Sequence, residues 1–148
     1  MKASTEWDPD GAGPASPVVV LGGSFSAAGT VAASRIAVYD PSQNIWTSLG
    51  TGMADGGFTE VKALAVLANG DLVAGGDFLT AGGVTTNNVA RWDGAAWHPL
   101  GSGLNGPVYA LALDASGNLY AGGGFTTAGG VTANYIAQWE GASWSAIG

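Results

Sequence analysis

Short apolar runs separated by turn residues follow one another along the whole chain. The segments Val61–Gly76 and Val108–Gly123 each contain two such runs, which carry small or apolar residues at successive positions, as in "VYALAL" and "NLYAGG". The pairs Asn69–Gly70 and Ser116–Gly117 between the runs supply the positive φ angles that tight hairpins need. No useful length of sequence shows the 3.6-residue period of a helix. The pattern therefore predicts antiparallel β-strands that are covered on both faces.

The whole pattern occurs three times. Gly-Gly pairs stand at 22–23, 75–76 and 122–123, and each is followed at matching positions by a phenylalanine, a third apolar run and a second aromatic residue. These are Phe25, Phe78 and Phe125; Arg35–Asp40, Asn88–Asp93 and Tyr135–Glu140; and Trp46, Trp97 and Trp144. Four strands repeated every ~40–50 residues are typical of a β-propeller blade. We therefore predict an all-β chain of three four-stranded antiparallel blades, at residues 1–50, 51–101 and 102–148, without separate domains. Phe78 and Phe125 are expected to be buried between blades.

The repeats resemble kelch repeats, in which a Gly-Gly pair ends the second strand and a spaced aromatic pair marks the third and fourth. The stretch "YDPSQNIWTSLG" (Tyr39–Gly50) is similar to the kelch phrase of Tyr-Asp-Pro, a short turn and Asn-x-Trp. The units are also similar to the Gly-Gly- and Trp-rich repeats of large secreted bacterial proteins that are grouped with a fungal cell-polarity marker family. The resemblance covers essentially the whole chain and implies a propeller fold and a secreted parent protein. It departs from kelch in the first strand, where Ser4–Glu6 stand in place of Leu64–Val66.

The two ends of the sequence coincide with the predicted blade boundaries, which favours a fragment of three whole blades. The start, Met1–Trp7, has a lysine but no apolar segment, so we expect no signal peptide in this chain. The longest aliphatic run, Val18–Leu21, is far shorter than the ~20 residues of a membrane helix.

Composition removes several classes of function. Only 10% of the 148 residues are charged and the net charge is −7. Nucleic acids require clustered Lys and Arg, and anionic membrane surfaces require polybasic patches, so neither is an expected partner. The chain has no cysteine, which excludes disulfides, thiolate metal ligands and a cysteine nucleophile.

Candidate chemistry is sparse. His98 is the only histidine and has no repeated partner for acid–base work, so a polar surface position is favoured. The acids of "DPDGAG" (Asp8–Gly13) suit a calcium loop, but the distal glutamate of such a loop is missing and a β-turn is favoured. We therefore expect no catalytic, cofactor or metal residues.

Two function hypotheses remain: a non-enzymatic, self-assembling scaffold or protein-interaction module, and a glycan-binding propeller with pockets between its blades. For a ligand, the candidate contacts are the repeat-equivalent Asn87 and Asn134, together with Trp7, which belongs to no repeated position of the same size. The other tryptophans recur at equivalent positions and are expected to serve packing.

The blade count bears on assembly. Propellers usually have about four to eight blades, and three are too few to close a ring. We therefore expect a homodimer that completes a six-bladed ring, with another protein or a glycan as further candidate partners. Glu6 falls in an innermost strand, where it must face water or find a donor.

Overall fold

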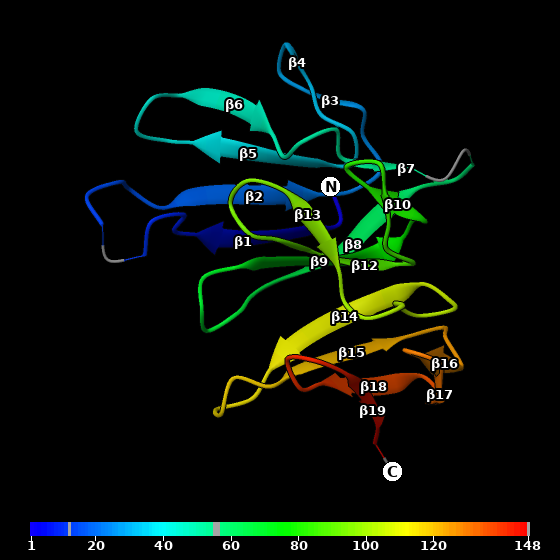
Figure 1. Cartoon of the computed structure of the whole chain (residues 1–148). Helices are drawn as coiled ribbons and strands as arrows, with labels where there is room; N and C mark the ends of the chain where they lie inside the picture. Colours follow the sequence, from blue (N-terminus) through cyan, green and yellow to red (C-terminus); the bar gives the residue numbers. More distant parts are fainter. Residues whose placement is uncertain (12, 55–56, 148) are drawn as a thin grey trace.

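The chain folds into three four-stranded antiparallel sheets. The computed structural model describes residues 1–11, 13–54 and 57–147. We call the sheets I, II and III in chain order, and they are stacked in that order with sheet II in the middle (Figure 1). All elements of the described residues are β-strands, which confirms the all-β prediction. Within this described part, no helix has the length and apolar character needed to cross a membrane.

Each sheet has its strands in chain order from one edge to the other. Sheet I consists of β1 (Ala3–Trp7), β2 (Val18–Gly22), β5 (Ile36–Asp40) and β6 (Ile45–Ser48). Sheet II consists of β8 (Glu60–Val66), β9 (Leu72–Asp77), β12 (Val89–Trp92) and β13 (Trp97–Pro99). Sheet III consists of β14 (Val108–Leu113), β15 (Leu119–Gly123), β18 (Ile136–Trp139) and β19 (Trp144–Ala146).

A short hairpin lies between the second and third strand of every sheet, a feature that the apolar pattern did not predict. The three hairpins are β3 (Ala27–Ala28) with β4 (Val31–Ala32), β10 (Thr80–Ala81) with β11 (Val84–Thr85), and β16 (Thr127–Ala128) with β17 (Val131–Thr132). The segment that links two sheets joins the hairpin of the second one: β7 (Met53–Ala54) pairs with β10, and Leu104 forms a bridge to Ala128. These short pairings fasten sheets II and III to the links that precede them.

One backbone device fixes the turn from the Gly-Gly pair into the third strand. Arg35, Asn88 and Tyr135, which precede β5, β12 and β18, all have left-handed φ angles of 69°, 73° and 72°. In each unit the N–H of this residue donates to the carbonyl of the repeated phenylalanine, and its carbonyl accepts from the second glycine of the pair. The same loop geometry thus recurs with three different side chains.

The core lies between the sheets rather than within any one of them. One buried cluster joins sheets I and II, and a second joins sheets II and III. Phe78 belongs to the first and Phe125 to the second, both with 0% of the residue exposed, which confirms that they are buried. The inner strands β1, β8 and β14 pack side by side, and Glu6 on β1 is exposed, as its charge requires.

Phe78→Ala and Phe125→Ala should each lower the free energy of unfolding by about 3–5 kcal/mol, because each removes a fully buried ring from between two sheets. Urea titration followed by circular dichroism measures the change. Phe58→Ala is the matched control, since that ring is 65% exposed and its loss should cost less than about 1 kcal/mol. Equal effects at all three positions would contradict the inter-sheet core.

Candidate functional site

Asn87, the first candidate ligand contact, lies in a cleft between sheets II and III. The cleft has a volume of about 410 Å³, and its walls come from the loops around the β10–β11 hairpin, the link from β13 to β14, and the β16–β17 hairpin. Asn87 has a left-handed φ of 51°, and its Nδ2 donates to the carbonyl of Ser102 at 3.0 Å. This amide therefore holds the link against sheet II.

The other amides of the cleft are also engaged within the protein. Asn88 is buried; its Nδ2 donates to the carbonyl of Leu104 at 2.9 Å, and its Oδ1 accepts from the N–H of Phe78 at 3.2 Å. Asn105 Oδ1 accepts from the N–H of Thr126 at 2.8 Å, and its Nδ2 donates to the hydroxyl of the same residue at 2.9 Å. The cleft has no charged lining residue among those described, so it suits water or a neutral polar group rather than acid–base chemistry.

Asn134, the second candidate contact, has different surroundings. It is exposed next to β18, on the side of sheet III that no other sheet of the described residues covers. At the equivalent positions of the first two units, the backbone carbonyl binds the link that follows. The carbonyl of Ser34 accepts from the N–H of Met53 at 3.1 Å, and the carbonyl of Asn87 accepts from the N–H of Leu104 at 2.9 Å. The structure therefore does not place the two asparagines in equivalent pockets, and their role as ligand contacts stays a prediction.

Trp7, the third candidate contact, is a packing residue by its geometry. Only 6% of it is exposed, and it belongs to the cluster between sheets I and II. Its Nε1 donates to the carbonyl of Gly70, in the β8–β9 turn, at 2.8 Å. Trp7 also lines a second cavity of about 320 Å³. The indole thus ties the end of β1 to the neighbouring sheet, and ligand contact by Trp7 stays a prediction.

The second cavity is acidic, and it includes part of the calcium-loop candidate. Asp8 and Asp10 line it, and the N–H of Gly11 donates to the carbonyl of Asp8 at 3.3 Å in a turn. The N–H of Ala15 holds the pKa of Asp10 below its usual value, whereas a hydrogen bond with Asp10 raises the pKa of Asp8. Residue 12 of the "DPDGAG" stretch lies outside the described residues.

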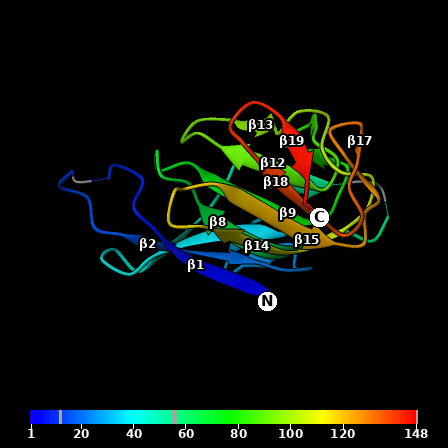
Figure 2. The same cartoon turned by 90° about the horizontal axis from the view of Figure 1, so that it is seen from below.

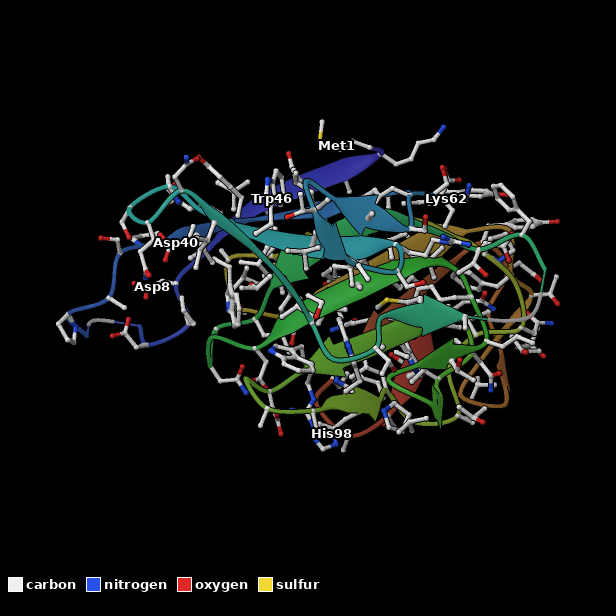
Figure 3. All side chains as sticks on the ribbon, turned by 90° about the horizontal axis from the view of Figure 1, so that it is seen from above. Met1, Asp8, Asp40, Trp46, Lys62 and His98 are labelled. Carbon is white, nitrogen blue, oxygen red and sulfur yellow. The ribbon has the colours of Figure 1, made fainter. Side chains whose placement is uncertain are left out.

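Two further acids at this cavity are paired. Asp71 Oδ2 accepts from Arg91 at 2.6 Å. Asp93 Oδ2 lies 2.7 Å from Nε2 of His98, and the N–H groups of two turn residues, together with His98, hold the pKa of Asp93 well below its usual range. His98, which is labelled in Figure 3, thus has a partner five residues away, Asp93, within its own β12–β13 hairpin. Within the described ranges, no three His, Cys, Asp or Glu side chains are arranged to hold a metal ion.

The sequence reasoning missed Glu60, a buried carboxylate at the start of β8. Only 3% of it is exposed, and it pairs with Lys62 on its own strand and with Lys2, 3.7 Å away, just before β1. Lys62 Nζ also lies 5.7 Å from the ring centroid of Tyr109 on β14. This network connects the inner strands of all three sheets. The sequence held one signal of this network: Lys2 and Lys62 occupy equivalent positions in the first two repeats.

Glu60 predicts a pH-dependent stability. Lys62, and then Lys2, lower the pKa of its carboxyl in the folded state, so the ionised form stabilises the fold above the unfolded pKa of about 4.3. This contribution is lost as the pH falls through the lower, folded-state pKa. The free energy of unfolding should therefore fall more between pH 6 and pH 3 for the wild type than for Glu60→Gln. A Glu60→Gln profile parallel to the wild type would contradict this role.

Comparison with known proteins agrees with this architecture. A family model described as the Rax2 C-terminal beta propeller domain matches residues 12–148, which include β2, β5 and β6 of sheet I and the whole of sheets II and III. No relative matches among the curated proteins. The family match confirms the resemblance to a propeller repeat family linked to the fungal polarity marker. The chain belongs to the family of Rax2 C-terminal beta propeller domains.

Proposed function

We propose that this chain is a non-enzymatic, protein-binding propeller module that closes its ring by pairing with a second copy of itself. The observation that carries the proposal is the contrast between two equivalent positions. Val89, at the start of β12, is 0% exposed because sheet III covers it, whereas Ile136, at the start of β18, is 42% exposed. Sheet III thus presents to solvent a face that its counterpart in sheet II buries.

Neighbouring positions on the same face support this contrast. Ala63 and Ala65 on β8 are buried, whereas their equivalents Ala110 and Ala112 on β14 are exposed. Figure 2 looks onto this face of sheet III from below. Extended apolar faces of this kind are rare on soluble monomers, because covering them with a partner releases about 25 cal/mol for each Å² of apolar surface buried.

The opposite end of the stack is incompletely covered as well. Phe78 and Phe125 are fully buried against the preceding sheet, but Phe25, their equivalent in sheet I, is only partly buried. The two ends of one chain are therefore the two different halves of a sheet-to-sheet contact. Two copies related by a two-fold axis would pair sheet III of each with sheet I of the other, and the resulting six sheets lie within the usual range of about four to eight blades.

Light scattering coupled to size exclusion should give twice the 14.6 kDa mass of the chain at micromolar concentration. Circular dichroism of the same fraction verifies that the protein is folded. A folded species with the mass of one chain would refute the self-pairing. A closed assembly with more copies would keep the self-pairing and correct the size of the ring.

The glycan-binding alternative has weaker support, because the amides of the cleft between sheets II and III already bind loop backbone and hydroxyl groups. Multivalent display on a glycan array should therefore show no reproducible binding. Saturable binding to a glycan that Asn87→Ala abolishes would instead favour the lectin function.

A further inference from the structure

Two contacts recur at the joint where one sheet packs against the next, and the first is made by a leucine at the start of the link between them. We call this leucine the wedge residue. Leu49, after β6, and Leu100, after β13, are buried in the two inter-sheet clusters. In each case a tryptophan on the last strand of the next sheet donates its indole N–H to the wedge residue's carbonyl. Trp97 Nε1 donates to Leu49 and Trp144 Nε1 donates to Leu100, each at 2.9 Å.

The second contact is a valine seated on a glycine. Val61, at the start of the inner strand of sheet II, packs against Gly22 of sheet I, and Val108 of sheet III packs against Gly75 of sheet II. A Cβ atom added to Gly75 would lie 2.6 Å from Cγ1 of Val108, and a Cβ on Gly22 would collide with Val61 in the same way. Both glycines are therefore required because the next sheet occupies the space that a side chain would fill.

Sheet III has the first half of this joint without an occupant. Gly122 is the equivalent of Gly22 and Gly75, but a Cβ added there would meet only the carbonyl oxygen of Tyr135, at 3.8 Å. Ile147 occupies the wedge position and is 39% exposed, although Leu49 and Leu100 are buried. The glycine at 122 is thus not required by any contact within the described part of its own chain.

Sheet I has the second half. Trp46 is the equivalent of Trp97 and Trp144, yet its indole N–H has no hydrogen-bond partner among the described residues. An apolar cavity of about 220 Å³ lies beside it, lined by the following residues: Met1, Leu21, Phe25, Ala27, Ala28 and Trp46. Figure 3, which looks down onto sheet I, labels Met1 and Trp46 on this side. Met1 stands at the position of Val61 and Val108 and is 77% exposed.

We propose that a second copy of this chain completes the joint through these two contacts. Ile147 of one copy enters the cavity beside Trp46 of the other, whose indole N–H donates to the Ile147 carbonyl, and Met1 packs against Gly122. This inference rests on the proposed self-pairing and names the residues that carry it. The second copy is the occupant that the structure favours, because the two unfilled halves repeat a contact formed twice within the chain.

The inner edge of this joint differs from the internal ones. Ser4 and Glu6 stand where β8 has Leu64 and Val66, which pack against the cluster between sheets I and II. Met1 has a longer side chain than Val61 at the equivalent position, and this offsets part of the volume lost where Ser4 stands in place of Leu64. Glu6 stays at the hydrated inner edge, where the repeat-equivalent Leu113 is also exposed. The joint between copies is therefore weaker than the internal ones and depends mainly on the outer cavity.

Gly122→Val is the most direct test, because an added Cβ meets only the Tyr135 carbonyl oxygen at 3.8 Å among the described residues of the isolated chain, whereas the proposed pairing would fill this space with Met1. The dissociation constant of the pair, measured by sedimentation at several concentrations, should rise at least about a hundredfold, and circular dichroism of the monomer should not change. Ala115→Val, on the exposed β14–β15 turn, is the control for added volume and should pair like the wild type. Trp46→Phe keeps an aromatic ring but loses the donor and should weaken pairing by about tenfold.

Mixing two variants identifies the surfaces that meet. Gly122→Val damages the sheet III half, and Ala28→Glu puts a carboxylate into the cavity of sheet I. Each alone should be monomeric, because both joints of its pair are damaged, whereas an equimolar mixture retains one intact joint and should form a heterodimer. If Ala28→Glu fails to fold, the Gly122→Val result decides by itself.

The possible results separate this inference from the proposed function. A dimeric wild type with an equally dimeric Gly122→Val variant would overturn the inference but leave the self-pairing standing, since the copies would then meet through another surface. A wild type with the mass of one chain would overturn both. Loss of pairing by Gly122→Val, together with recovery in the mixture, supports the joint.

Discussion

Apolar sheet faces that must be covered on both sides are the constraint on which this structure depends. A single four-stranded sheet of this sequence has no core of its own, because its large buried residues point toward the sheets before and after it. The hydrophobic effect therefore acts between repeats, and each sheet is stabilised by its neighbours. Among the residues that the structure describes, only sheet II has a neighbour on both sides.

The parts of the fold that each repeat specifies locally could be predicted from the sequence. The Gly-Gly pairs, the phenylalanines after them and the spaced aromatic residues led to four strands per unit and to the burial of Phe78 and Phe125. The aromatic pairs Trp92–Trp97 and Trp139–Trp144 keep the same 5.3 Å between ring centroids, as expected of repeated packing positions. Periodicity is informative here because the local backbone is the same in every copy.

The specific hydrogen bonds and ion pairs between units could not be predicted from the repeat pattern. The bond from Trp97 to Leu49 joins residues that are 48 positions apart, and the ion pair of Lys2 with Glu60 joins the ends of two different sheets. The surroundings of the candidate contacts differ for the same reason: Asn87 donates to a following link, whereas no such link lies beside Asn134 in the described residues. A repeat alignment shows equivalence in sequence, but the surroundings of each position depend on its neighbours.

The tryptophan that bridges two sheets donates to a main-chain carbonyl, and such an acceptor is present whichever amino acid occupies the position. The hydrogen bond therefore does not depend on the side chain of the wedge residue, which is leucine at positions 49 and 100, where the bond forms, and isoleucine at the equivalent position 147. A unit whose tryptophan donates to a main-chain carbonyl finds the same acceptor in a duplicated copy of itself, whatever side chain that position carries. Gene duplication can lengthen such a protein before any compensating mutation arises.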